Sequence, residues 1–400
     1  MGIFSGIGVN LRCLLNNKRP ALNYFFYYLI YWAACSCLTP YLGNYYESRG
    51  LTGSQIGMLG SAVSAVIILS SSFTNYMADC TRKPKLILII ALFGMSAAAI
   101  LIYKSGSYFV LYIAVLLFYF CNAPTLTLPD KLLLDCIQKT PEKYSLYRLG
   151  GSIGNAIGSI IVGEIILEFG NETSFHLFVP VMAITAVFAM FLPSPESKTS
   201  KQRTAGHLKS LLISNKFYLI YGSLAVWGVT GTSISLFLGI RLLNSGLTSQ
   251  HLGIVIACNM IGEIVSFIIA PRLLKKFRAE FIIILSFLIQ IIRTGTLMLL
   301  PPMPILILGQ IIGGADFSLI WASTTQLIDY YYPKSISNTA QGMKTFANMG
   351  VGQIIGSLIL GSIYQHLGAA YVFGIVTILS IIYTIWLSLA CLVKKNLPLT

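Results

Sequence analysis

The sequence predicts an all-α membrane protein in which twelve transmembrane helices form two related halves of six. The first observation is composition: 56% of the 400 residues are hydrophobic and only 10% are charged, whereas about a quarter of a soluble domain is charged. The second is that apolar stretches of about 20 residues, long enough to cross a bilayer, recur along the chain. The third is one long polar interruption near the middle, with related motifs on either side of it.

The predicted helices follow one another with short turns between them. They cover residues 21–45, 53–78, 84–104, 106–137, 143–169, 173–193, 217–243, 249–274, 279–300, 303–331, 338–367 and 369–393. The polar segment 194–216, between the sixth and seventh helices, is expected to be a cytoplasmic linker. The predicted domains are therefore an N-terminal six-helix bundle, residues 1–193, and a C-terminal six-helix bundle, residues 217–400.

Positive charge indicates the orientation in the membrane. The chain holds 27 Lys and Arg against 13 Asp and Glu, a formal net charge of +14. With the N-terminus inside, only Arg49, Lys104 and Arg241 fall on the outer side, and nearly all other basic residues, Lys344 among them, fall on the cytoplasmic side. We therefore expect both termini in the cytoplasm of a multi-pass protein of the cell (plasma or inner) membrane, surrounded by lipid. Because the charges are spread loop by loop, we expect no nucleic-acid binding.

Two pairs of motifs indicate an internal duplication. LTGSQIG (Leu51–Gly57), at the start of the predicted second helix, matches LTSQHLG (Leu247–Gly253), at the start of the eighth. GSIIVGEIILEFG (Gly158–Gly170) matches GSLILGSIYQHLG (Gly356–Gly368), at the ends of the fifth and eleventh helices. Duplicated bundles are the plan of many secondary transporters, in which solute binds near the membrane midplane between the halves.

Two arginines lie inside apolar helices, where a charge costs about 2.5 to 3.5 kcal/mol on insertion scales. Each therefore needs an acidic partner. Consecutive antiparallel helices bring residues to one depth when both lie equally far from the turn, and Asp130 and Arg148 are equally far from Lys139. We expect Asp130 and Arg148 to face each other.

The second buried arginine, Arg293, has two acidic residues at its level. Glu263 and Arg293 are equally far from Arg278, and Asp316 reaches a similar depth beyond the next turn. Two carboxylates would then share one guanidinium, which favours uptake and release of a proton by one of them. Such a group can couple solute movement to a proton gradient. The alternative is that these charges form ion pairs that only hold the helices together.

The chain offers little for catalysis or metal binding. Its four histidines and eight cysteines are scattered, without the spacing of metal ligands or a gathered nucleophile and base. We expect no enzyme activity, no metal and no cofactor, and a proton gradient as the driving force.

The turn between the second and third helices, NYMADCTRKPK (Asn75–Lys85), resembles the loop G-x-L-A-D-R-x-G-R-R-K of the major facilitator superfamily. Asp79, Arg82 and Lys83 match that loop, whereas its first position and Pro84 depart from it. The resemblance covers nearly the whole chain. It implies that Asp79, Arg82 and Lys83 form a cytoplasmic latch that stabilises one conformation; a basic turn without this role is the alternative.

Within the superfamily, the chain resembles the branch of lactose permease and the phenylpropionate-type permeases. Asp130 and Arg148 have the spacing of the acid and the arginine in the lactose permease sugar site. Ile261–Glu263 resembles its M-G-E segment, and Arg293 and Asp316 have the spacing of its ninth-helix arginine and its proton-carrying tenth-helix glutamate.

Three positions depart from lactose permease. Gln310 and Gly313 stand in place of its tenth-helix lysine and histidine, and Asn155 stands in place of its sugar-stacking tryptophan. We therefore do not expect lactose as the solute.

The resemblance and the buried charges together predict a secondary active transporter: a proton-coupled symporter of a small organic solute that works by alternating access and is functional as a monomer. The solute would be a sugar, a nucleoside, or an aromatic or other organic acid. The implied site residues are, for the solute, Asp130, Arg148 and Asn155 and, for proton coupling, Asp316, Glu263 and Arg293. The alternatives are a transport-inactive membrane sensor or assembly factor on the same fold, and a proton-driven exporter.

Overall fold

The computed structural model describes residues 19–137, 141–193, 217–332 and 337–395. These residues form helices and turns, with no strand among them. The N-terminal half contains α2 (Arg19–Leu38), the 3₁₀-helix η1 (Thr39–Tyr41), α3 (Leu42–Ser48), α4 (Gly53–Thr81), α5 (Pro84–Lys104), α6 (Tyr108–Cys136), α7 (Pro141–Phe169) and α8 (Thr173–Ala189). The C-terminal half contains the π-helix η2 (Tyr218–Gly222), α10 (Ser223–Leu243), α11 (Ser249–Lys276), α12 (Ala279–Leu299), α13 (Met303–Gly313), α14 (Ala315–Tyr331), α15 (Ser337–Thr345), the π-helix η3 (Phe346–Gln353), α16 (Ile354–Leu367) and α17 (Ala369–Lys395).

The predicted segments correspond to helical crossings in the order expected. In the described part of the chain, ten helices are long and apolar enough to cross a membrane, and α8 is a shorter apolar helix. The first crossing is made by α2, η1 and α3 together, because the 3₁₀-helix η1, which contains Pro40, separates the two α-helices. The all-α membrane fold is thereby confirmed. The side of the membrane on which the termini lie stays a prediction.

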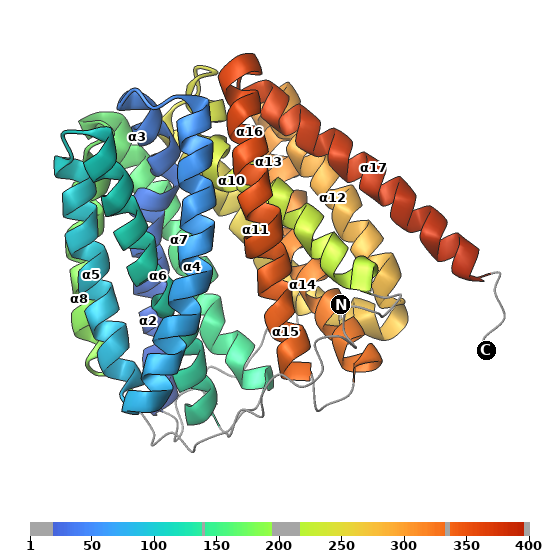
Figure 1. The fold of residues 1–400 in the computed structure, drawn as a ribbon, viewed down its shortest axis with the longest axis horizontal. Coiled ribbons are helices and arrows are strands. Elements are labelled where there is room, and N and C mark those ends of the chain that lie inside the picture. The colour runs from blue at the N-terminus through green and yellow to red at the C-terminus, as the bar shows by residue number, and fades with distance from the viewer. Residues whose placement is uncertain (1–18, 138–140, 194–216, 333–336, 396–400) are drawn as a thin grey trace, which may run out of the picture.

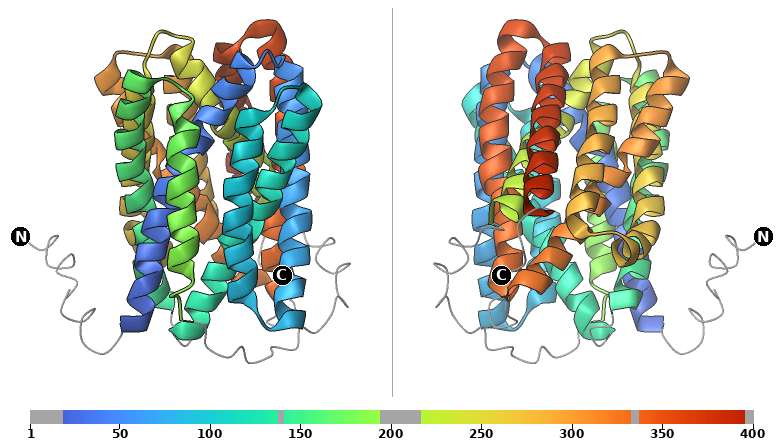
Figure 2. Two further views of the ribbon diagram at one scale, coloured as in Figure 1. Left: turned by 90° about the vertical axis from the view of Figure 1, so that its left-hand side faces the viewer. Right: turned by 90° about the vertical axis from the view of Figure 1, so that its right-hand side faces the viewer.

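The two halves stand side by side, and α12 and α17 of the C-terminal half are inclined to α4 of the N-terminal half (Figures 1 and 2). In the N-terminal half α2 packs on α7 and α8, and α5 packs on α6 and α8; in the C-terminal half α12 packs on α17 and α14, and α10 packs on η3 and α17. The segment 194–216 lies outside the described residues, so its role as a linker and the domain boundaries at 193 and 217 stay predictions.

The repeated motifs fold in the same way in both halves. Thr52 and Thr248 each cap the helix that follows, α4 and α11, in a capping box with the third residue of that helix. Gly50 and Gly246 come just before, with φ angles of 79° and 84°, a backbone region that glycine adopts without strain. We call the end of the bundle that carries these turns the outer end, because the charge pattern predicts that it faces outside.

The halves contact each other closely at the outer end. A Cβ atom at Gly57 would clash with the carbonyl oxygen of Ser357, so α4 touches α16 at the backbone. In the same way, a Cβ atom at Gly253 would clash with the carbonyl oxygen of Ser159, so α11 touches α7. Small residues allow such close approach in membrane helices. The two contacts use corresponding positions of the duplicated motifs, and together they close the outer end.

We expect the substitution Gly57→Val to loosen this closure, since its added carbons collide with the backbone at Ser357. Overpacking of this kind costs about 1–3 kcal/mol. The measurement is the rate of disulfide formation between cysteines introduced at Ser54 and Gln365, which are joined by a hydrogen bond of 3.0 Å; this rate should fall. Gly295→Val is the control, because a Cβ atom there meets no atom within 4 Å. Equal rates in the two variants would contradict the closure.

Candidate functional site

The first charge cluster lies in the N-terminal half, where Asp130 of α6 and Arg148 of α7 form an ion pair. The hydroxyl of Tyr28 donates to Asp130 Oδ1 at 2.5 Å, and Arg148 Nη1 donates to the hydroxyl of Tyr144 at 2.8 Å. The guanidinium carbon of Arg148 lies 5.9 Å from the centre of the Tyr28 ring. The pairing expected from equal depth is confirmed, and two tyrosines complete the cluster.

Glycines on α7 bring this cluster together. A Cβ atom at Gly150 would clash with the carbonyl oxygen of Phe25, and one at Gly154 would clash with that of Leu29. The backbone of α7 therefore lies directly on α2. This contact places Arg148 next to the tyrosines of the first helix.

The second charge cluster lies in the C-terminal half, where Arg293 Nη1 of α12 is 3.1 Å from Asp316 Oδ2 of α14. The side chains of Arg293 and Asp316 are 12% and 2% exposed, against 41% and 25% for Arg148 and Asp130. The ion pair of the N-terminal cluster is therefore partly exposed, whereas that of the C-terminal cluster is enclosed.

Close backbone contacts also position the C-terminal cluster. Gly262 of α11 has no room for a Cβ atom beside the carbonyl oxygen of Ile311, and Gly314 has none beside that of Asn259. These contacts hold α11 against the junction of α13 and α14. Asp316 lies in the first turn of α14, directly after this junction.

Glu263 completes a layer of three charges without pairing directly. It interacts electrostatically with Asp316 and Arg293, but within the described residues its side chain forms no ion pair or hydrogen bond. In the pair itself, Asp316 Oδ1 and Arg293 Nε are buried and have no hydrogen-bond partner in the described part of the chain. Buried polar atoms are normally paired. The layer thus holds two carboxylates and one guanidinium. Asp316 Oδ1 remains able to accept a proton or a hydrogen bond, and Arg293 Nε remains able to donate a hydrogen bond.

Asn155 lies where the halves meet. Its Nδ2 atom is 3.5 Å from Met260 Sδ on α11, and its Oδ1 atom accepts from the Ser159 hydroxyl at 3.2 Å. No hydrogen bond described here joins it to Asp130 or Arg148. Its expected role as a solute contact stays a prediction.

The expected latch residues surround the turn between α4 and α5. Asp79 forms an ion pair with Lys131 of α6. Arg82 ends α4 in the left-handed conformation, with φ 55°, and Lys83 precedes α5, its backbone N–H facing the Thr81 hydroxyl at 3.4 Å. The ion pair of Asp79 lies within the N-terminal half, so the latch role stays a prediction.

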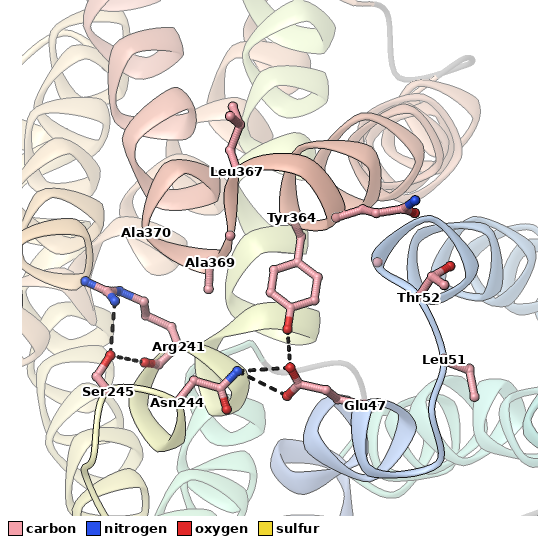
Figure 3. A pocket seen from close by; sticks show the side chains of 13 residues that line it. Glu47, Leu51, Thr52, Arg241, Asn244, Ser245, Tyr364, Leu367, Ala369 and Ala370 are labelled. Atoms are coloured by element: carbon pink, nitrogen blue, oxygen red, sulfur yellow. Dashed lines mark hydrogen bonds between the residues drawn. The ribbon is translucent and has the colours of Figure 1, made fainter.

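A pocket of about 600 Å³ lies at the outer end between the two halves (Figure 3). On one side of it is Glu47 of α3, whose Oε1 atom accepts a hydrogen bond from Asn244 Nδ2 at 3.0 Å and one from the hydroxyl of Tyr364. Asn244 follows α10, and Tyr364 belongs to α16. One carboxylate of the N-terminal half therefore holds two elements of the C-terminal half, beside the glycine contacts that close this end.

Several residues of these sites escape sequence reasoning. Tyr28 is one of several tyrosines in its helix, and nothing in the sequence distinguishes it from the others. Glu47 lies in a predicted loop, where a glutamate is ordinary. Tyr144 could have been found, because it precedes Arg148 by one helical turn. The expectation for Lys344 was wrong: its side chain is not on the cytoplasmic surface but is 1% exposed within the C-terminal half.

Comparison with known proteins agrees with this architecture. A sequence model described as the MFS_1 like family matches residues 21–375. The chain is 24% identical over 368 residues to a maltose permease of Geobacillus stearothermophilus, covering 91% of this chain and 93% of that protein. It is 21% identical over 359 residues to a probable 3-phenylpropionic acid transporter of Escherichia coli, covering 89% and 93%. The crystal structure of the nucleoside transporter NupG superposes with a TM-score of 0.80 at 17% identity, covering 95% of this chain and 100% of that one.

We expect the substitution Arg293→Met to lower the free energy of unfolding by about 3–5 kcal/mol, because it leaves Asp316 buried without a cation. The double variant Arg293→Met/Asp316→Leu should recover much of this loss, since neither charge of the pair remains. The unfolding midpoint of purified protein in detergent measures both effects, with Arg272→Met, at an exposed position of α11, as the control. A double variant no more stable than Arg293→Met would be evidence against the ion pair as the cause.

Proposed function

The chain belongs to the MFS_1 like family of major facilitator transporters, and from this premise we propose that it is a proton-coupled symporter of a small organic solute. It works as a monomer by alternating access, in which the two halves open to one side of the membrane at a time. The observation that carries the proposal is the layer in which Asp316 and Glu263 share Arg293. Coupling needs an intramembrane carboxylate that can change its protonation state, and this layer has one more carboxylate than it has guanidinium groups.

Asp316 carries the proton in this mechanism. With one proton in the layer, Arg293 balances whichever of Asp316 and Glu263 stays ionised. Without that proton, the layer holds an uncompensated negative charge away from water, which is costly in a low-dielectric surrounding. Protonation therefore favours the closed arrangement of the C-terminal helices, and loss of the proton favours an arrangement that admits water to the layer.

The solute binds at the N-terminal cluster. Asp130 and Arg148 offer a charged acceptor and a planar fork of donors, and the hydroxyls of Tyr28 and Tyr144 add further hydrogen-bonding groups. These four side chains come from α2, α6 and α7, and the side chains of Arg148 and Asp130 are partly exposed. Asn155, further along α7 at the contact with α11 of the other half, is a further contact for the same solute. The relatives named for maltose, nucleosides and 3-phenylpropionic acid define the panel of solutes to test.

The outer closure and the turn after α4 are the two gates in this proposal. Release of Glu47 from Asn244 and Tyr364, together with separation of the glycine contacts, opens the outer side. Asp79, Arg82 and Lys83 act as the latch at the opposite end. Alternation requires that both gates are never open together, since an open path through the membrane would dissipate the gradient.

The coupling role of Asp316 is tested with purified protein in liposomes. We expect Asp316→Asn to abolish proton-driven accumulation of the transported solute while solute exchange continues, because the amide can still accept a hydrogen bond from Arg293 but cannot take up or release a proton. Uptake of labelled maltose, uridine and 3-phenylpropionate is followed with and without a pH gradient, and an external pH electrode records proton entry.

The control for this experiment is Glu168→Gln, which changes an exposed carboxylate near the end of α7. Accumulation that survives in Asp316→Asn at the wild-type level would remove Asp316 from coupling. Absence of flux for the whole panel in the wild-type protein would instead favour a transport-inactive role for this fold.

The solute-binding role of Arg148 gives a second prediction. We expect Arg148→Gln to weaken binding of the transported solute by roughly 10- to 100-fold, the loss of one charge-assisted hydrogen bond worth about 1.5–3 kcal/mol. Equilibrium binding of labelled solute to protein in detergent measures the effect, with Arg272→Gln as the control. Wild-type affinity in Arg148→Gln would place the solute elsewhere.

A further inference from the structure

We propose that Lys344, Trp321, Phe317 and Trp227 form a second solute subsite in the C-terminal half, which takes a planar ring bearing an anionic group, that is, an aromatic carboxylic acid. The inference rests on the proposed function, because it narrows the solute class within it. It assigns the ammonium of Lys344 to the carboxylate and the aromatic side chains to the ring.

Among the described residues, the buried ammonium of Lys344 has no ion-pair partner. Its Nζ atom donates to the carbonyl oxygen of Trp321 at 3.0 Å and to the hydroxyl of Thr325 at 2.5 Å. Asp329 acts on it electrostatically, but no carboxylate in the described ranges forms an ion pair with it. Both acceptors are neutral groups, and a hydrogen bond to a carboxylate is shorter and stronger than one to a neutral acceptor. A solute carboxylate is therefore a better partner for this ammonium than the two it has here.

Aromatic rings continue from Lys344 toward α10. Lys344 Nζ lies 4.1 Å from the centre of the Trp321 ring, the Trp321 and Phe317 ring centres are 5.7 Å apart, and the Phe317 and Trp227 ring centres are 5.5 Å apart. The interplanar angle is 34° in both ring pairs. Tilted rings at these separations are within the range of favourable aromatic contact, so the set offers several faces to a ring that enters beside them.

Trp227 adds two signs that this region receives a ligand. Its indole Nε1 atom is buried and finds no hydrogen-bond partner within the ranges that the structure describes, which is rare for a polar group. One turn later on α10, a Cβ atom at Gly231 would meet only the Trp227 ring, at 3.9 Å, so there is open space on this side of the ring. An entering solute could fill that space and accept a hydrogen bond from the indole.

The helices that carry these groups are fixed relative to each other. A Cβ atom at Gly228 would clash with the carbonyl oxygen of Asn348, so α10 lies directly on η3, the π-helix that follows Lys344 after one residue. π-helical segments occur frequently at functional sites. The contact sets the distance between Lys344 and Trp227, and it gives a site of defined size.

The competing interpretation is that Lys344 only ties α15 to α14. The two interpretations differ in what happens when the charge is removed. If Lys344 only links the two helices, its replacement lowers stability but does not change the preference for a charged over a neutral ligand. If Lys344 belongs to a subsite, its replacement removes that preference.

The experiment measures equilibrium binding of 3-phenylpropionate and of its neutral amide, 3-phenylpropionamide, to full-length protein in detergent, from quenching of tryptophan fluorescence. We expect the wild-type protein to bind the acid at least about ten-fold more tightly than the amide, the value of one charge-assisted hydrogen bond. Lys344→Met should remove this preference, because it weakens binding of the acid and leaves binding of the amide nearly unchanged. Trp321→Leu should weaken both ligands. Lys104→Met and Trp386→Leu, at exposed positions, are the matched controls.

A second variant keeps the inference testable if Lys344→Met does not fold. Thr325→Val retains the ammonium and removes one of its present acceptors, so it should strengthen binding of the acid relative to the amide. Equal affinities of acid and amide in the wild-type protein, or an unchanged preference in Lys344→Met or Thr325→Val, would overturn the subsite. Binding is measured without a gradient, so its outcome is separate from that of the flux experiment. If the acid binds but is not taken up with protons, only the symport proposal is rejected. If maltose or uridine is taken up but the acid does not bind, only the subsite proposal is rejected.

Discussion

An ionised side chain held among membrane helices must be compensated by groups close to it, because the surrounding hydrocarbon offers neither water nor counter-ions. This constraint governs the arrangement of the charged side chains at the centre of the molecule. Arg148 is balanced by Asp130, Arg293 by Asp316, and Lys344 by a carbonyl, a hydroxyl and an aromatic face. The three arrangements differ in how many hydrogen-bonding atoms they leave without a partner, and that difference decides what each group of side chains can do.

The N-terminal pair has its hydrogen bonds completed by tyrosines and remains accessible, which suits a group that exchanges partners with an entering molecule. The Arg293–Asp316 pair is enclosed and incompletely bonded, with Glu263 beside it. A site with unsatisfied atoms in a closed surrounding is sensitive to the gain or loss of one proton, since there is little else to absorb the change in charge. The proposed division between a solute site in one half and a proton site in the other follows from this asymmetry.

Backbone contact at glycine is what makes such compensation possible. Gly150 and Gly154 bring α7 onto α2, and Gly262 and Gly314 bring α11 onto the junction of α13 and α14. With any larger residue the helices would stand further apart and the charges would face lipid or empty space. The same device closes the outer end twice, at positions that the duplication relates. In the proposed outer gate, backbone contacts can separate without breaking strong bonds, and the hydrogen bonds of Glu47 and the one between Ser54 and Gln365 are among the polar connections to be released.

The sequence alone determined the number and order of the crossings, the duplication, and the depth of the buried charges. These follow from properties that are local or cumulative along the chain: apolar length, helical rise, and distance from a turn. For this reason Asp130 and Arg148 could be paired by counting, and Asp316 could be set at the level of Arg293. Only the tertiary structure decided the partners that depend on helix rotation and on contacts between distant segments. Tyr28 on Asp130, Glu47 between Asn244 and Tyr364, and Lys344 under Trp321 are of this kind, because depth fixes the height of a side chain in the membrane and packing fixes the direction in which it points.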